Sequence, residues 1–359
     1  MSSAPSFAVD AHVLTGRPQG TRTVLLTLLR AIADLGEACR FVLYAHDVAA
    51  ARRVIDRPGF AYRPIPAGSA AMRLLVHLPA MLARDRPAAA LFQYIAPPTW
   101  RGRSVVAVHD ILPLTHPWLF PRGFQLRSRV LFTMSIARAR RVIAVSEFTQ
   151  AALAARFPAC TGKLRLVVNG PSFPLAAYAA PPAPATGERI VLAVGRLERR
   201  KNMPLLARAF VRAAVPDLRL VIVGRGERGH SCDLPQHPAI EVRADDDDDE
   251  LIALYRRAAL FVMPSSAEGF GLPLLDATLF GVPAIAARCC ALPEVGGRGC
   301  RYFDPDAPDA EGVLAGVIRG HSGDSPIVPP AAWPAQQMAR FDPAKSARAL
   351  IRSLEEAAA

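Results

Sequence analysis

Two carboxylates lie eight residues apart around a glycine-rich loop in the second half of the chain. The loop, residues 264–271, follows an apolar run at residues 260–263 and precedes Pro273, a residue type favoured at the first position of a helix. A buried strand, a loop and a helix over residues 273–280 are therefore predicted. The free N–H groups and the positive dipole end of such a helix start bind anions, most often phosphates.

Glu268 and Asp276 are the two carboxylates that flank this expected anion site. Glu268 lies on the loop, and Asp276 lies about one turn into the helix, where side chains tilt back toward the amino terminus. Carboxylates beside a bound phosphate suit hydroxyl groups better than they suit the phosphate. An anion flanked by polyols indicates a nucleotide sugar. The alternative is a helix start whose acidic residues serve only the dipole.

Two basic residues follow another apolar strand, which is predicted over residues 189–194. Arg196 and Lys201 come after this strand and its closing Gly195. Two fixed cations at one strand end can neutralise a diphosphate, because arginine grips it with two donors and lysine acts as a point charge. The alternative is a basic surface loop.

These strings resemble the retaining glycosyltransferases of the GT-B fold, most of all glycosyltransferase family 4 (glycosyl transferases group 1). The Glu268–Asp276 spacing is similar to the family's Glu-x₇-Glu signature with Asp as the second acid, and Arg196–Lys201 is similar to its Gly-Arg-x₄-Lys-Asn string. The resemblance implies that Glu268 contacts the donor sugar, Asp276 the ribose, and Arg196 and Lys201 the diphosphate. The implied donor-binding residues are Gly16, Gly20, Gly195, Arg196, Lys201, Gly224, Glu268, Gly269, Phe270, Gly271, Leu272 and Asp276.

A histidine ends one of the apolar strands of the first half. His109 follows residues 104–108 and precedes Asp110, a pair similar to the His-Asp pair of family-4 enzymes. The resemblance implies that His109, with Glu268, Arg196 and Lys201, belongs to the catalytic set and contacts the transferred sugar. A histidine at a strand end is by itself more often a structural hydrogen-bonding residue, so both interpretations stay open.

A loop with Gly16 and Gly20 separates a first strand, residues 6–10, from a helix predicted over residues 24–35. Such a loop lies at the carboxyl edge of a parallel sheet, where ligands bind. The resemblance implies that it approaches the donor phosphates and the acceptor, and the alternative is a plain turn.

The chain's 359 residues, of which 51% are hydrophobic and 21% charged, suffice for two folded domains. The fold expected from the resemblance is α/β, with two doubly wound Rossmann-like domains facing across a cleft. The expected boundaries are an acceptor-binding domain at 1–173, a linker at 174–186, a nucleotide-sugar-binding domain at 187–340 and a helix at 341–359 that packs back on the first domain.

Positive charge is concentrated in the first half, because residues 1–173 hold 22 Lys and Arg against 8 Asp and Glu. This half should face an anionic partner, such as a membrane surface, a lipid phosphate or nucleic acid. An amphipathic helix at residues 72–84 and the arginine-rich segment 121–141 could make the contact. Arg122, Arg127 and Arg129 of that segment are the candidate acceptor-binding residues. The alternative for both segments is an ordinary packed or solvated helix.

No apolar run approaches the roughly 20 residues that a membrane-spanning helix needs, and no secretory signal is visible. The six cysteines lack metal-binding spacing and suit a reducing cytosol. An aspartate run at 245–249 could mimic a metal-binding Asp-x-Asp motif, but its place before a predicted helix favours capping. We therefore expect no metal and no cofactor, and a cytoplasmic protein with peripheral contact to the inner face of the cytoplasmic membrane.

The expected function is a metal-independent retaining hexosyltransferase of bacterial polysaccharide or exopolysaccharide biosynthesis. It would move a sugar from GDP-mannose or a UDP-sugar to a saccharide or a polyprenyl-diphosphate-linked acceptor. A nucleotide-sugar epimerase or phosphorylase on the same fold is one alternative. A non-enzymatic binder of nucleic acid or an anionic surface is another. That binder leaves the Glu268–Asp276 string unexplained, so nucleic acid is not an expected partner.

Overall fold

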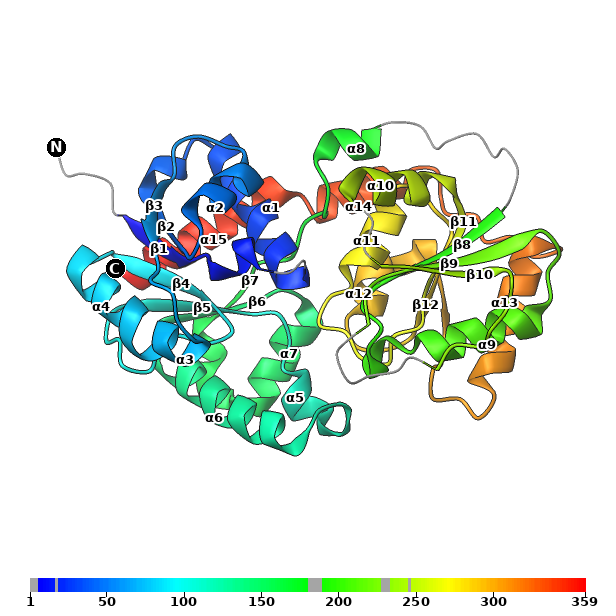
Figure 1. Ribbon diagram of the computed structural model, residues 1–359, viewed down its shortest axis with the longest axis horizontal. Helices are drawn as coiled ribbons and strands as arrows, with labels where there is room; N and C mark the ends of the chain where they lie inside the picture. The colour runs from blue at the N-terminus through cyan, green and yellow to red at the C-terminus, as the bar shows by residue number, and fades with distance from the viewer. Residues whose placement is uncertain (1–5, 17–18, 180–188, 227–232, 245–246) are drawn as a thin grey trace. The chain divides into compact units, whose positions relative to one another are not determined.

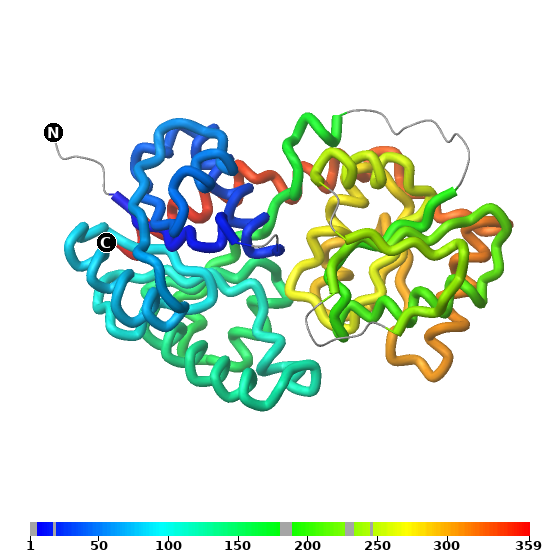
Figure 2. The backbone as a smooth tube through the Cα atoms, in the orientation of Figure 1, coloured from blue at the N-terminus to red at the C-terminus, as the bar shows by residue number. Residues whose placement is uncertain are grey.

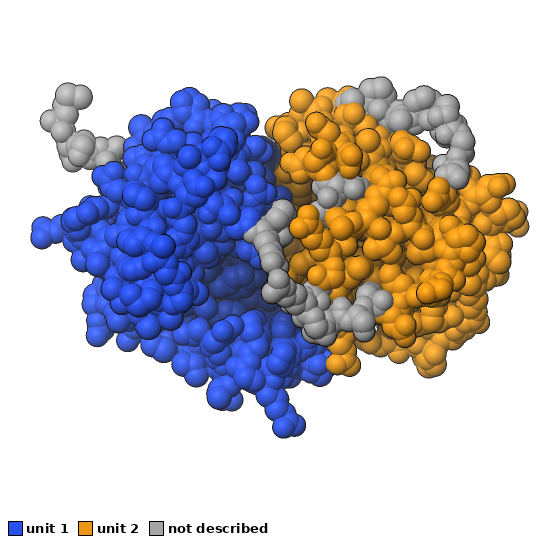
Figure 3. Space-filling model, viewed as in Figure 1, with its two compact units in different colours: residues 1–170, 341–359 blue, residues 171–340 orange. Residues whose placement is uncertain are grey.

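The computed structural model describes residues 6–16, 19–179, 189–226, 233–244 and 247–359. The chain divides into two compact units, unit 1 with residues 1–170 and 341–359, and unit 2 with residues 171–340 (Figure 3). Each unit is built on one parallel sheet with helices on both of its faces (Figure 1). The expected α/β class with two doubly wound sheets is confirmed.

Unit 1 contains seven parallel strands in the order β3-β2-β1-β4-β5-β6-β7. The central strands are buried along their whole length, which explains why they are continuous apolar runs rather than alternating ones. The strands are β1 (Phe7–Asp10), β2 (Phe41–Ala45), β3 (Ala61–Pro64), β4 (Ala89–Gln93), β5 (Ser104–Val108), β6 (Arg141–Ala144) and β7 (Leu164–Leu166).

The helices of unit 1 lie on both faces of its sheet, with α1, α2 and α15 on one face and α4, α6 and α7 on the other (Figure 1). They are α1 (Gly20–Asp34), α2 (Val48–Ile55), α3 (Ala70–Met72), α4 (Leu78–Asp85), α5 (Leu112–Thr115), α6 (Arg122–Arg138), α7 (Glu147–Arg156) and α15 (Pro343–Ala358). A π-helical segment, Arg73–His77, joins α3 to α4.

The last helix, α15, returns to the unit in which the chain begins (Figure 2). It packs against α1 and contacts β4, β5 and β6. Ion pairs fix its end, because Arg40 contacts Glu355 at 2.9 Å and Arg141 contacts Glu356 at 2.8 Å. None of the helices in the described part of the chain is long and apolar enough to cross a bilayer.

Unit 2 contains six parallel strands in the order β10-β9-β8-β11-β12-β13. The strands are β8 (Arg189–Val194), β9 (Leu218–Val223), β10 (Ile240–Arg243), β11 (Ala258–Met263), β12 (Ala284–Ala287) and β13 (Cys300–Phe303). The helices are α8 (Leu175–Ala179), α9 (Met203–Ala213), α10 (Asp248–Arg257), α11 (Leu272–Leu279), α12 (Leu292–Gly296), α13 (Ala310–Ser322) and α14 (Trp333–Arg340).

Several predicted elements differ from those observed. The helix expected at 72–84 begins at Ala70 and is interrupted by the π-helical segment. The helix expected at 24–35 begins earlier, so Gly20 is its first residue and not a loop residue. Strand β13 is not among the predicted elements, and its parallel partner β12 stabilises it. The expected linker contains helix α8 at its start, and residues 180–186 of it lie outside the described residues.

Each sheet reverses its strand order at one point. In unit 1 the reversal lies between β1 and β4, and in unit 2 it lies between β8 and β11. In doubly wound sheets ligands bind outside the carboxyl ends of the strands at this switch point. The two switch points therefore indicate where functional side chains should be sought.

Candidate functional site

Glu268 belongs to a buried cluster of opposite charges at the switch point of unit 2. Lys201 Nζ donates to Glu268 Oε1 at 2.6 Å, and Arg200 Nη1 donates to Oε2 at 2.9 Å. Lys201 is 8% exposed and Glu268 is 6% exposed, so water screens the pair only weakly. Arg200 also pairs with Glu198 at 2.7 Å within the turn after β8, and its bond to Glu268 ties this turn to the loop after β11.

Glycine backbones let these two loops approach each other. The Lys201 side chain runs beside Gly195, where a Cβ would meet it at 3.4 Å. Gly224, directly after β9, lies so close that a Cβ on it would be 2.0 Å from the carbonyl oxygen of Gly195. Only glycine fits at position 224, and the strand ends of β8 and β9 pack through bare backbone.

Helix α11 begins beside Glu268 without a side-chain cap. Its N-cap, Gly271, has φ +105°, and a Cβ there would lie 2.7 Å from Leu292 Cδ2. Within the described chain, the amides of Gly271 and Leu272 have no hydrogen-bond acceptor. The preceding Phe270 is buried and Gly269 completes the loop. Two amides at a helix start and the cations beside them suit an anion.

Asp276 lies inside α11 and is 2% exposed. Its Oδ1 accepts hydrogen bonds from the Tyr178 hydroxyl at 2.6 Å and from the Ser172 amide at 3.0 Å. Both of these bonds converge on Oδ1, so this oxygen holds the carboxylate in place.

The two carboxylates titrate in opposite directions. Burial raises the pKa of Glu268, but the charges of Lys201 and Arg200 outweigh burial and lower the pKa to about 2. Burial raises the pKa of Asp276 to about 6, although its bonds to Ser172 and Tyr178 oppose the rise. Glu268 is therefore ionised throughout the physiological range, and Asp276 titrates at its lower end.

Arg196 differs from the other cations of this site. Its side chain is 51% exposed, and its Nη2 lies 3.2 Å from Glu198 Oε2. Lys201 and Arg200 are committed to Glu268, so Arg196 is the cation that can move toward a ligand at small cost. Arg196, Arg200 and Lys201 together exceed the two carboxylates, Glu198 and Glu268, by one positive charge.

His109 is the first residue after β5, at the carboxyl edge of the sheet of unit 1. Its Nε2 lies 2.6 Å from Gln93 Oε1, and its ring packs against Tyr94 with 5.1 Å between centroids. Burial lowers the pKa of His109 to about 4, so the imidazole is neutral at pH 7. Because Gln93 Oε1 accepts the Nε2 proton, Nδ1 offers a lone pair.

The remaining candidates of unit 1 are exposed. Gly16 ends the short 3-10 turn after β1, and Gly20 begins α1, while residues 17–18 between them lie outside the described residues. Arg122, Arg127 and Arg129 are exposed on α6. Arg127 lies over the Phe124 ring at 5.2 Å. No acidic side chain of the described chain pairs with these three arginines.

The expected capping role in the aspartate run appears at Asp247, whose side chain accepts from the Glu250 amide at the start of α10. Asp245 and Asp246 lie outside the described residues. Across the described residues, no group of three or more His, Cys, Asp or Glu side chains could hold a metal ion.

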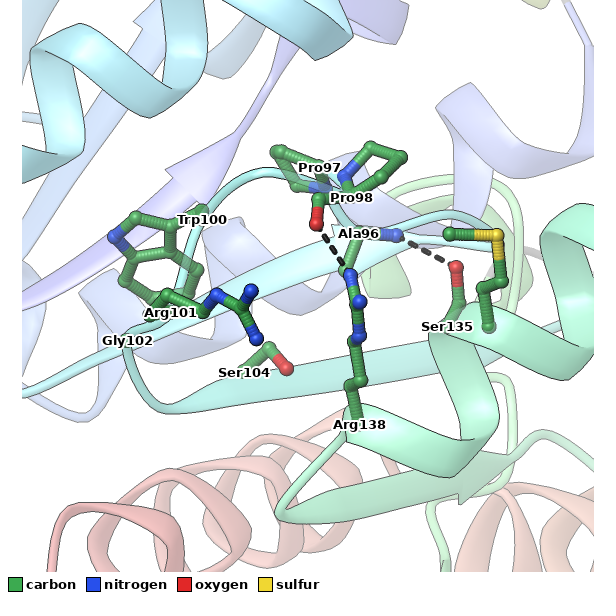
Figure 4. Close-up of a pocket in the computed structure, with 10 residues that line it drawn as sticks. Ala96, Pro97, Pro98, Trp100, Arg101, Gly102, Ser104, Ser135 and Arg138 are labelled. Carbon is green, nitrogen blue, oxygen red and sulfur yellow. Dashed lines mark hydrogen bonds between the residues drawn. The ribbon is translucent and has the colours of Figure 1, made fainter.

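A cavity of about 200 Å³ lies near the amino end of β5 (Figure 4). It is lined by Trp100, Arg101, Ser104 and Arg138 among others. Arg138 donates to the carbonyl of Pro98, and the Ala96 amide donates to Ser135 Oγ at 3.2 Å, as the dashed lines show. The cavity lies at the wrong end of the strand to join the switch-point residues.

Sequence reasoning missed three partners of the predicted residues. Arg200 stands between Arg196 and Lys201 in the sequence, and its charge was the only signal that could have drawn attention to it. Gln93 and Tyr178 gave no signal, because their contacts with His109 and Asp276 arise only from the packing of strand β4 and helix α8.

Two sequence profiles match the chain, one for "Glycosyltransferase Family 4" at residues 18–171 and one for "Glycosyl transferases group 1" at residues 177–310. No curated protein shows a significant match to the chain.

Several solved structures share the fold over nearly the full chain. Anabaena HepE in complex with UDP and glucose is similar with a TM-score of 0.76 and 18% identity, over 98% of this chain and 100% of that one. Further HepE structures contain UDP or UDP-glucose. Sucrose-phosphate synthase from Thermosynechococcus elongatus is similar with a TM-score of 0.75 and 18% identity, over 97% of this chain and 98% of that one. WaaG, a glycosyltransferase involved in lipopolysaccharide biosynthesis, is similar with a TM-score of 0.70 and 15% identity, over 95% of this chain and 98% of that one.

The two profiles match one region of each unit, and the fold is that of the similar solved structures. The chain therefore belongs to glycosyltransferase family 4 and is a retaining, nucleotide-sugar-dependent glycosyltransferase with the GT-B fold.

Proposed function

We propose that the protein is a hexosyltransferase whose donor, a UDP-sugar or GDP-mannose, binds at the switch point of unit 2. The observation that carries this proposal is the buried Lys201–Glu268–Arg200 cluster beside the uncapped start of α11. Cations and backbone amides suit a diphosphate, and the two carboxylates suit hydroxyl groups on either side of it. The UDP and UDP-glucose seen in the HepE complexes are ligands of this class.

Transfer with retention requires the bond between the anomeric carbon and the diphosphate oxygen to break, with its electron pair leaving on the diphosphate. The acceptor oxygen forms the new bond on the same face, and its proton passes to the departing diphosphate. Lys201, Arg196 and the two amides at the start of α11 stabilise the charge that develops on that leaving group. This chain's residues thus supply positive electrostatics, and no side chain is needed as a covalent nucleophile.

Glu268 and Asp276 are proposed to orient the donor rather than to react. Glu268 is held ionised by Lys201 and Arg200, so it can accept hydrogen bonds from sugar hydroxyls. Asp276 would use Oδ2 for the ribose, because Oδ1 is occupied by Tyr178 and Ser172. Asp276 is one methylene shorter than Glu, and these two bonds fix its position within the helix.

His109 is proposed to contact the transferred sugar as a neutral acceptor. Gln93 orients the ring, and burial keeps it uncharged. A neutral imidazole accepts a hydrogen bond from a sugar hydroxyl through Nδ1 without adding charge to the departing diphosphate.

The acceptor is proposed to be a saccharide or a lipid-linked saccharide of bacterial polysaccharide biosynthesis, reached at the cytoplasmic membrane. The first half of α6 supports this, because Arg122, Arg127 and Arg129 lie among exposed apolar side chains. Leu126 is 66% exposed, and Val130 is 49% exposed. Arginines interspersed with exposed apolar residues suit a surface with anionic headgroups and acyl chains.

A donor screen tests the main proposal. The full chain is melted with UDP-glucose, UDP-galactose, ADP-glucose and GDP-mannose, and one of these should raise the melting temperature as its concentration rises above its dissociation constant. Release of the matching nucleoside diphosphate should follow, and the product should keep the donor's anomeric configuration by NMR. No thermal shift and no nucleotide release with all four sugars would overturn the donor assignment.

Vesicle sedimentation tests the membrane contact. Vesicles with phosphatidylglycerol should retain the protein better than pure phosphatidylcholine vesicles. The triple variant Arg122→Gln/Arg127→Gln/Arg129→Gln should lose this preference, whereas Arg208→Gln, an exposed arginine of unit 2, should keep it. Equal retention of the triple variant and the parent would exclude α6 as the contact.

A further inference from the structure

The switch point of unit 1 holds a polar cluster that the donor site does not use. Asp10 ends β1, His12 follows two residues later, and Arg73 begins the π-helical segment. Arg73 donates to Asp10 Oδ2, and His12 Nδ1 lies 2.9 Å from Asp10 Oδ1. Asp10 is 3% exposed and Arg73 is 8% exposed, so the charged pair forms the buried base of the cluster.

His12 has one fixed and one available ring nitrogen. Its Nδ1 is held between Asp10 Oδ1 and Arg73 Nη1, the latter at 3.0 Å. Its Nε2 has no hydrogen-bond partner among the described residues, and it is not one of their buried polar atoms without a partner. The His12 side chain is 26% exposed. The imidazole is therefore anchored on one side and open on the other.

This arrangement matches a hydroxyl ligand in either tautomer. When Nδ1 carries the proton and donates to Asp10, Nε2 accepts a hydrogen bond, and in the other tautomer Nε2 donates one. A hydroxyl group can satisfy both. A carboxylate behind a histidine is the usual device for fixing ring orientation toward a ligand.

The location also points to a ligand. The cluster lies between β1 and β4, where the strand order reverses, and His109 lies two strands away, at roughly 10 Å by strand spacing. π-helical segments are rare and occur often at functional sites. The same segment exposes Leu75 and Val76, which are 50% and 48% accessible.

Stability alone gives no reason for this cluster. A buried ion pair is at best weakly stabilising relative to apolar side chains of similar size. We propose that His12 binds a hydroxyl of the acceptor sugar through Nε2, and that Asp10 and Arg73 are the positioning residues that hold its ring. This inference rests on the proposed function, because it assigns the acceptor of that same reaction.

Two substitutions separate ligand binding from a structural role. The amide of Asn coincides with Nδ1 of histidine and can still reach Asp10, whereas the amide of Gln reaches the position of Nε2. With UDP-glucose, or whichever donor the screen selects, transfer is measured to a panel of octyl glucoside, galactoside, mannoside and N-acetylglucosaminide. Donor KM, donor hydrolysis and melting temperature are followed in parallel.

His12→Asn should lower kcat/KM for the accepted glycoside at least tenfold, and His12→Gln should retain more transfer than His12→Asn. The donor KM should stay within twofold in both variants. The matched control is His46→Asn, an exposed histidine after β2 at the same sheet edge, which should transfer like the parent.

The opposite ranking, with Asn active and Gln inactive, would show that His12 only supports Asp10, and it would overturn the proposal. A parent enzyme that hydrolyses the donor but glycosylates no panel member would also overturn it, while leaving the donor site intact. Failure of every donor to bind or react would instead refute the proposed function itself. In that case saturation-transfer NMR of the octyl glycosides still tests His12, and equal signals from parent and His12→Asn would reject it.

Discussion

At the switch point of unit 2 the buried carboxylate of Glu268 meets two cations, whereas in unit 1 the buried carboxylate of Asp10 meets one cation and a histidine. Both carboxylates are buried at the carboxyl edge of a parallel sheet and are held by ion pairs. Unit 2 adds glycine loops and an uncapped helix start, which suit a diphosphate. Unit 1 presents the imidazoles of His12 and His109, which suit neutral hydroxyl groups.

The net charges of the two units are opposite to what the positions of these two sites would suggest. Residues 1–170 hold 22 Lys and Arg against 8 Asp and Glu, and residues 171–340 are slightly acidic. The proposed phosphate site is nevertheless in the acidic unit. Net charge therefore indicates which surface an anionic partner meets, and local placement of a few buried cations decides where a phosphate binds.

Lys201→Ala should give the largest effect. It leaves Glu268 buried with only Arg200, which should cost about 3–5 kcal/mol of unfolding free energy and lower transfer at least tenfold. Urea unfolding and steady-state kinetics measure the two quantities. The double variant Lys201→Met/Glu268→Gln should recover part of the stability and none of the transfer. Near-normal turnover in Lys201→Ala and Glu268→Ala alike would end the assignment of the donor site to unit 2.

Gly224→Ala should come next, because its Cβ would overlap the Gly195 carbonyl. We expect a loss of about 1–3 kcal/mol in unfolding free energy. The corresponding change in unit 1, Gly16→Ala, meets only Val13 O at 3.7 Å and should change stability by less than about 0.5 kcal/mol. Chemical denaturation compares them. Equal losses would mean that the glycine loops of the two units are built alike.

The pH dependence should distinguish the units further. The pKa of Asp276 is raised to about 6, so its carboxylate is protonated as the pH falls below 6, and donor KM should rise severalfold between pH 7 and pH 5. His109, whose pKa is about 4, stays neutral over this window. Asp276→Asn should flatten the profile. An unchanged slope in that variant would assign the titration to another group.

The pKa shifts of Asp276 and Glu268 also make the stability of the protein depend on pH, in opposite directions. Because the pKa of Asp276 is raised on folding, its contribution is present below its ordinary value of 3.8 and is lost as the pH rises to about 6. The lowered pKa of Glu268 acts oppositely, and its contribution is lost as the pH falls from 4.5 toward 2. The difference in melting temperature between Asp276→Asn and the parent should therefore change mainly between pH 4 and pH 6.

The smallest effect should come from an exposed ion pair. Arg208 contacts Glu311 at 2.9 Å on the surface of unit 2, with the arginine side chain 51% exposed. Arg208→Ala should change the unfolding free energy by less than about 1 kcal/mol and leave transfer unchanged. A loss as large as that of Lys201→Ala would show that burial is not what distinguishes the site cluster.

The sequence predicted most elements of unit 2, because its strands, loops and helices are signalled locally. The fold class followed from the resemblance to glycosyltransferase family 4. The strand at 260–263, the glycine loop and Pro273 identify β11 and α11 from adjacent residues. Helix α8 was missed because a short helix in a proline-rich segment has no periodic pattern. The strand β13 was missed because its stability comes from pairing with β12.

The candidate residues of unit 2 could be named from sequence because they lie in two short strings, and adjacent strands bring such strings together at one sheet edge. Their pairing was decided only by the tertiary structure: Glu268 with Lys201 and Arg200, and Asp276 with Tyr178. The cluster of Asp10, His12 and Arg73 could not be predicted, since Arg73 is 63 residues from Asp10 in the sequence and only the tertiary structure brings them together. The residue types of each loop can be seen in the sequence. The pairing of the buried charges depends on the order of the strands in each sheet.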